Sequence, residues 1–82
     1  MQILHAWRAP PGGQAVAYAN VRISDDVAVM NIKITDRAGK RGAYAPNANG
    51  ARVVTFSPEL AASIADAAID YIQGASAHDR HR

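Results

Sequence analysis

The chain has 82 residues, a formal net charge of +2 and no cysteine. A chain of this length forms one domain with a thin hydrophobic core, and the absence of cysteine excludes disulfide bonds that would stabilise it. The N-terminus has neither a basic leader nor a long apolar run, and no stretch reaches the length of a membrane span. We therefore expect a soluble, cytoplasmic protein with no membrane partner.

The first third of the chain is typical of antiparallel strands. Gln2–Arg8 predicts a short strand that ends at the P-P-G-G turn of residues 10–13, because no regular element passes through two prolines and two glycines. Residues 14–23 and 27–35 alternate between apolar and polar side chains, and the S-D-D between them is turn chemistry. These two segments predict a hairpin.

The hairpin register follows from placing Asp25 and Asp26 in the turn. That register predicts four pairs on the apolar face, namely Ile23–Ala28, Val21–Met30, Ala19–Ile32 and Ala17–Ile34. On the other face it pairs Tyr18 with Lys33, a ring beside a cation, which suits base stacking next to a phosphate contact. Cross-strand pairs of this kind also occur for packing alone.

The next segments predict a second hairpin and then a helix. Residues 36–42 form a glycine-containing turn, residues 42–46 a brief strand, N-A-N-G a turn, and residues 51–56 a final strand. Ser57 is a good N-cap and Pro58 suits the first helical position, so a helix is predicted over residues 58–73, ended by Gly74. The prediction is an α+β fold: an antiparallel meander of four to five strands, packed by one C-terminal helix. Residues 1–73 form the domain and residues 74–82 a flexible tail.

The predicted helix has a wide apolar surface. On a helical wheel its apolar residues spread over roughly 200°, whereas a helix on its own sheet needs a stripe of roughly 100°. We therefore expect a homodimer that uses Leu60, Ile64, Ile69, Tyr71 and Ile72. The alternative is that alanines widen the arc without needing burial.

Charge is distributed unevenly along the chain. Residues 1–52 contain seven Lys or Arg and three acidic residues, a net charge of +4, while the remaining residues carry −2. Cations in and around the D-R-A-G-K-R-G turn are candidates for phosphate contacts: Lys33, Arg37, Lys40, Arg41 and Arg52. The alternative is a solvated turn, since exposed cations are common in turns.

Catalytic and metal-binding patterns are absent from the sequence. The A-G-K-R-G stretch lacks the upstream glycine and the following Ser or Thr of a phosphate-binding loop, and no serine stands in a nucleophile elbow. His78 and His81 have no third ligand beside them, so no metal site is expected. These patterns predict a protein that is not an enzyme and needs no cofactor.

Three segments resemble the SpoVG family of bacterial regulators in their order along the chain. They are V-A-V-M-N-I-K-I-T-D at residues 27–36, G-A-Y-A-P at residues 42–46 and R-V-V-T-F-S-P-E-L at residues 52–60, with Pro46 matching a proline at a strand end in the family. The likeness covers residues 17–72, and its motifs are short and apolar. It implies a small α+β fold that dimerises and binds DNA or RNA as a regulator. Family members commonly continue past this helix with basic residues, whereas this chain has Arg80 and Arg82 there.

Taken together, these features predict a small, dimeric, non-enzymatic regulator that binds nucleic acid weakly and largely through charge. The alternative function is a protein-interaction module, of the kind that phages and mobile elements encode, which binds and inhibits a protein partner through the helix surface or a sheet edge.

Overall fold

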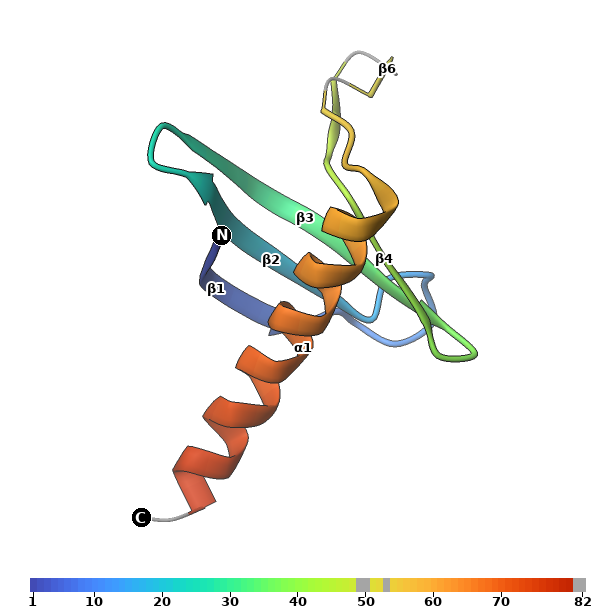
Figure 1. Ribbon diagram of the computed structural model, residues 1–82. Coiled ribbons are helices and arrows are strands. Elements are labelled where there is room, and N and C mark those ends of the chain that lie inside the picture. Colours follow the sequence, from blue (N-terminus) through green and yellow to red (C-terminus); the bar gives the residue numbers. More distant parts are fainter. Residues whose placement is uncertain (49–50, 53, 81–82) are drawn as a thin grey trace.

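The computed structural model describes residues 1–48, 51–52 and 54–80, and it confirms the α+β fold class. Four strands form one antiparallel sheet in the order β1-β2-β3-β4: β1 (Gln2–Arg8), β2 (Ala17–Ser24), β3 (Val27–Arg37) and β4 (Lys40–Tyr44). One helix, α1 (Pro58–Arg80), crosses a face of this sheet (Figure 1). Each strand pairs with the next in the chain, so the four strands are a meander.

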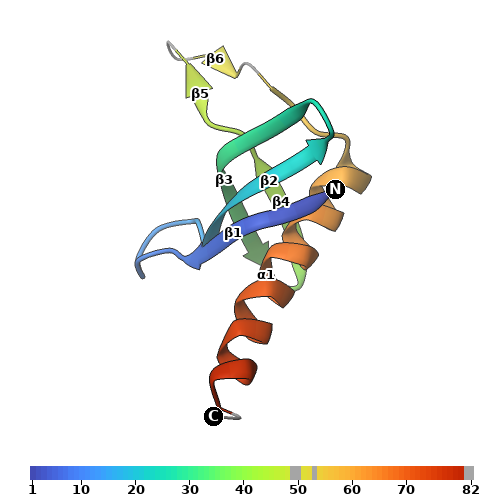
Figure 2. The ribbon, with the colours of Figure 1, turned by 90° about the vertical axis from the view of Figure 1, so that its left-hand side faces the viewer.

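The predicted final strand over residues 51–56 does not join this meander. Instead β5 (Asn47–Ala48) and β6 (Ala51–Arg52) pair only with each other, and residues 54–57 lead to α1 without strand structure. Figure 2 shows this small ribbon beyond the end of the sheet. Pro46 follows β4 closely and has no backbone N–H to donate to a ladder, which accounts for the break between β4 and β5.

The β2–β3 hairpin keeps the predicted register over only part of its length. Ala17–Ile34, Tyr18–Lys33 and Ala19–Ile32 pair as predicted, but Val21 then faces Val29 instead of Met30, and Arg22 faces Ala28.

One extra residue in β3 causes this shift, a bulge at Asn31. Asn31 has a φ of 58°, and its backbone N–H donates to Asn20 Oδ1 over 2.9 Å. The bulge turns the Met30 side chain out of the predicted core, so Met30 is 46% exposed while Ile32 is fully buried. Periodicity alone could not predict this change, because the pattern assumes an unbroken alternation.

The β3–β4 hairpin is tighter than the seven-residue turn predicted over residues 36–42. Arg37 pairs with Lys40, which leaves Ala38 and Gly39 as the two turn residues, with φ values of 52° and 84°. Two consecutive positive φ values are typical of the turns that match the twist of a two-residue hairpin. Asp36 Oδ1 accepts the Gly39 N–H at 3.1 Å and stabilises the turn.

Helix α1 begins where the sequence predicts and ends later. Ser57 Oγ accepts the Leu60 N–H at 3.2 Å, as expected of an N-cap. Gly74 does not end the helix, which continues to Arg80, so the predicted end at residue 73 is wrong. A glycine inside a helix costs only about 1 kcal/mol relative to alanine, and this cost alone does not end a helix. Among the described residues, no helix is long and apolar enough to span a membrane.

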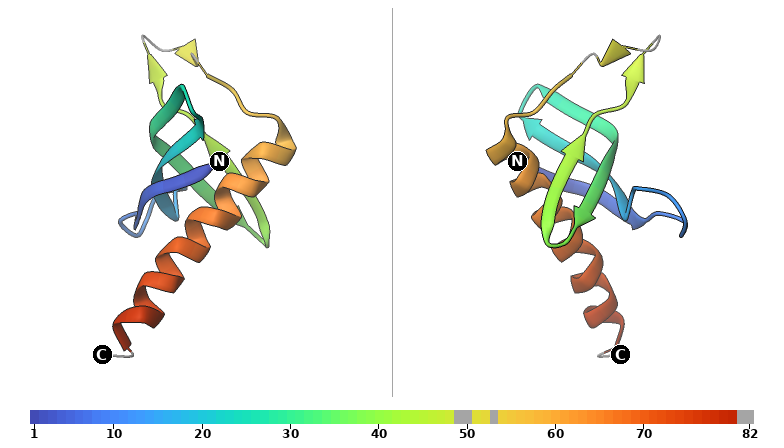
Figure 3. Two further views of the ribbon diagram at one scale, coloured as in Figure 1. Left: turned by 60° about the vertical axis from the view of Figure 1, so that its left-hand side comes forward. Right: turned by 90° about the vertical axis from the view of Figure 1, so that its right-hand side faces the viewer.

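The sheet curls around α1, so that the helix contacts both edge strands, β1 and β4, as well as the middle of the sheet (Figure 3). The core between the two layers consists of short or branched side chains: Ala6, Ala17, Ala19, Val21, Ile32, Ile34, Ala43, Ile64, Ala65 and Ala68. Alanines make up six of these ten residues and allow the helix to lie close to the sheet.

Candidate nucleic-acid interface

The outer face of the sheet, which points away from α1, carries a row of large side chains that crosses all four strands. Trp7 pairs with Tyr18, Tyr18 with Lys33, and Lys33 with Tyr44. The residues that flank Tyr18, Lys33 and Tyr44 along their strands are buried under the helix, so strand alternation places these three side chains outside. We call Trp7, Tyr18, Lys33 and Tyr44 the cross-strand row.

Neighbouring rings at the β1 end of this row stack on one another. The ring centroids of Trp7 and Tyr18 are 6.2 Å apart, with an angle of 25° between the ring planes, and His5 stacks on Trp7 at 5.5 Å. Lys33 Nζ lies 5.7 Å from the centroid of the Tyr44 ring, within the range of a cation–π interaction. Tyr44 is 41% exposed and gives the row an accessible aromatic surface.

Gly42 gives the Tyr44 ring its place on the hairpin. A Cβ atom added at Gly42 would lie 3.1 Å from Thr35 Oγ1 and 3.3 Å from both Cε2 and Oη of Tyr44. Because glycine has no Cβ, the ring packs against the strand backbone instead of being pushed away from it.

Three cations lie beside the Tyr44 ring. Lys33 and Arg37 are four residues apart on β3 and therefore lie on the same, outer face of the sheet. Lys40 of β4 pairs with Arg37. A hollow of about 420 Å³ is lined by these three cations, Tyr44 and Gln14 among others. Within the described part of the chain, Lys33, Arg37 and Lys40 form no ion pair.

A second hollow lies on the other side of Lys33. It measures about 400 Å³ and lies under the loop between β1 and β2, with Pro10, Pro11 and Tyr18 in its wall. Gln14 and Lys33 line both hollows, which are therefore neighbours on one face.

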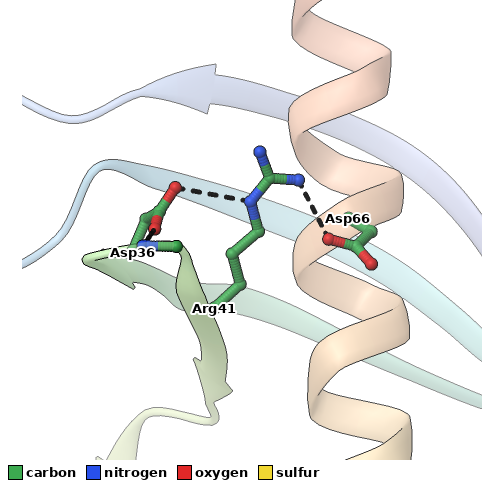
Figure 4. A network of polar contacts seen from close by, with 4 residues as sticks. Asp36, Arg41 and Asp66 are labelled. Carbon is green, nitrogen blue, oxygen red and sulfur yellow. Dashed lines mark hydrogen bonds and ion pairs between the residues drawn. The ribbon is translucent and has the colours of Figure 1, made fainter.

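Arg41 points to the opposite side of the sheet. Its Nε lies 3.3 Å from Asp36 Oδ2, and its Nη1 lies 2.9 Å from Asp66 Oδ1 on α1 (Figure 4). The hydrogen bond that Arg41 donates to the Asp66 carboxylate raises the pKa of Arg41 above its usual value, and the hydrogen bond that it donates to Asp36 adds to this shift. Asp36 is the one acidic residue in β1–β4, so its pairing with Arg41 leaves no carboxylate from these strands among the outer cations.

The structure thus divides the cations predicted as phosphate contacts. Lys33, Arg37, Lys40 and Arg41 all border one hollow, but the Arg41 guanidinium is bound to Asp36 and to Asp66 of the helix. Arg52 lies on β6, outside the four-stranded sheet. The Arg52 side chain lies outside the described residues.

The helix residues predicted for a dimer interface are largely engaged within the chain itself. Ile64 is fully buried in the core. Leu60, Ile69 and Ile72 are partly buried and pack against the core. Tyr71 is 38% exposed and is the one large apolar side chain of the described part of α1 that is exposed; its ring meets His5 edge-on at 6.1 Å. The curl of the sheet accounts for this coverage, because a curled sheet covers a wider arc of a helix than a flat one.

Sequence reasoning found Tyr18 and Lys33 but missed Trp7 and Tyr44. Their alignment depends on the registers of β1–β2 and β3–β4, which are set by a long loop and by a two-residue turn. Gly39 alone was a signal for Tyr44, because glycine suits the second position of a two-residue hairpin turn, and such a turn would have paired Lys33 with Tyr44. Ala38 gave no such signal, since alanine does not favour the positive φ of the first position.

Comparison with protein-family models, curated proteins and solved structures gives no match for this chain. The resemblance to the SpoVG family therefore stays a prediction from the sequence.

Proposed function

We propose that the protein is a non-enzymatic, nucleic-acid-binding regulator that uses the outer face of its sheet. The observation that carries this proposal is the gathering of Lys33, Arg37 and Lys40 beside the exposed Tyr44 ring. Cations that are not paired with carboxylates are available to phosphates, and phosphate contacts supply most of the affinity of non-specific nucleic-acid binding.

Three phosphate contacts predict weak binding with a definite dependence on salt. The logarithm of the affinity falls by about 0.7 to 0.9 per contact for each tenfold rise in salt, so three contacts give a slope of about 2 to 3. Non-specific binding of this type has dissociation constants of roughly 10⁻⁴ to 10⁻⁶ M at physiological salt. We leave Arg41 out of the proposed contacts because its guanidinium already pairs with Asp36 and Asp66.

The test is a salt titration of binding to a labelled oligonucleotide by fluorescence anisotropy. We expect Lys40→Ala to weaken binding and to reduce the slope by about one contact's share. Arg8→Ala is the matched control, since it removes one positive charge from β1 next to a hollow on the helix side. Equal effects of the two substitutions, or no binding by the unchanged protein at low salt, would contradict the proposal.

The dimer also stays a proposal, supported by the thin core and by the SpoVG resemblance. Light scattering over a concentration series measures it directly. A strict monomer at high concentration would exclude a dimer without affecting the proposed binding face.

A second candidate function has an observation of its own. No described strand pairs with the outer edge of β4, and a hollow of about 470 Å³ lies beside this strand, lined by apolar residues that include Ala43, Val54 and Phe56. Free sheet edges next to side-chain pockets are used by proteins that bind a partner's extended strand. Co-purification of one dominant protein that survives nuclease treatment would favour this function.

A further inference from the structure

The spacing of rings along the cross-strand row limits the form of nucleic acid that fits it. Tyr18 and Tyr44 lie two strands apart, with Lys33 between them. At about 4.8 Å between neighbouring strands, the backbone positions of the two tyrosines are about 10 Å apart. Successive bases in a duplex are about 3.4 Å apart and stack on each other, so two rings at this spacing reach only bases that have been splayed apart.

The width of the face also argues against contact with the bases of a duplex. The major groove of B-DNA is about 12 Å wide and admits a helix or a two-stranded ribbon. Four strands span about 14 Å between their outer backbones, before side chains are added. A duplex would therefore touch the cations through its phosphates and leave the rings without bases to contact.

The two hollows give each splayed base a place. One lies beside Tyr44 and the other beside Tyr18 under Pro10 and Pro11, with Lys33 between them. An aromatic ring in each wall and a cation between them match a base, a phosphate and a second base of one strand.

From these observations we infer that the ligand is single-stranded nucleic acid. One base stacks on Tyr44 and takes the place that Lys33 Nζ holds over the ring, a second base lies beside Tyr18, and the displaced Lys33 ammonium binds the linking phosphate. The inference rests on the proposed function and adds the class of ligand to it. Stacking of a base on an aromatic side chain is worth about 1 to 3 kcal/mol and depends little on sequence, so mixed sequences are expected to bind.

The experiment compares a single-stranded oligonucleotide of about ten nucleotides with a duplex of the same sequence, a length within the site sizes of single-strand-binding proteins. We expect the single strand to bind more tightly. Tyr44→Ala should weaken single-strand binding by about 5- to 150-fold, the equivalent of one lost stacking interaction, and should leave duplex binding and the salt slope unchanged. Tyr44→Phe keeps the ring and should bind like the unchanged protein.

Two further measurements support this test: one establishes that the variant is folded, and the other detects the ligand near Tyr18. Tyr44 is 41% exposed, and the melting curve of Tyr44→Ala establishes whether the variant is folded. Trp7 is the single tryptophan and stacks on Tyr18, so its fluorescence should change on adding the single strand and not on adding the duplex.

Equal affinity for the duplex and the single strand, or a folded Tyr44→Ala variant that binds the single strand normally, would overturn the inference. Salt-dependent binding through Lys33, Arg37 and Lys40 would still stand in both cases. If the unchanged protein bound neither the single strand nor the duplex, the proposed function itself would be refuted. The failure of the inference and the failure of the proposed function are therefore distinguishable.

Discussion

At the scale of single residues, two non-glycine residues of the described chain have positive φ, and they suit that conformation unequally. Asn31 has a φ of 58° and Ala38 a φ of 52°. Asparagine adopts left-handed conformations more readily than other residues with a side chain, whereas alanine has no polar group to offset the crowding of its Cβ. The bulge at Asn31 is therefore well served by its sequence, and the β3–β4 turn is not.

Ala38→Asn should stabilise the protein. Asn-Gly is the preferred pair for a two-residue hairpin turn, so we expect the free energy of unfolding to rise by about 0.5 to 1 kcal/mol. Ala38→Val should lower it, because a branched side chain is strained at positive φ. Urea unfolding followed by circular dichroism measures both; a stabilising Ala38→Val would contradict the observed turn.

The bulge at Asn31 makes a second prediction about neighbouring side chains of β3. Ile32→Ala should cost about 2 to 5 kcal/mol, since it leaves a cavity in the core. Met30→Ala should change the free energy of unfolding by only about 0.5 kcal/mol, because Met30 is 46% exposed. Comparable losses in urea unfolding would favour the unbroken register, in which both side chains enter the core.

At the scale of elements, local chemistry predicts where strands and helices begin better than where they end. The Ser57 cap and the alternation in β2 and β3 are local signals, and the structure follows them. Gly74 is also a local signal, but one glycine competes with the propensity of the residues on both sides of it. The predicted tail from residue 74 is thus helical as far as Arg80.

Gly74→Ala distinguishes the two ends proposed for the helix. In a helix that continues through this position, alanine should strengthen the last turns by about 1 kcal/mol and increase the helical circular dichroism signal. Space is available, because a Cβ at Gly74 would have no heavy atom within 4 Å. A decrease in helical signal would instead indicate a glycine that ends the helix in a left-handed conformation.

At the scale of the whole molecule, composition and periodicity were sufficient to predict the fold class. Strands with alternating apolar and polar residues, followed by one amphipathic helix, have few ways to bury their apolar sides. Composition and periodicity were insufficient to predict which side chains of the candidate site lie together. The two-residue turn at Ala38 sets Arg41 opposite Asp36, while a seven-residue turn would have left both outside the sheet. Similarly, a helical wheel shows which residues are apolar but contains no information on how far a sheet curls around them.

The seven alanines that are buried among the described residues have a consequence for the opposite side of the sheet. Six of them lie in the core between α1 and the sheet, and their short side chains let the sheet bend far enough for the helix to contact chiefly the edge strands β1 and β4. The same bend sets the distance between the aromatic rings outside. A bulkier residue at Ala19, which is fully buried, would force the layers apart and flatten the sheet. A substitution inside the core would therefore change the spacing of the rings on the outer face.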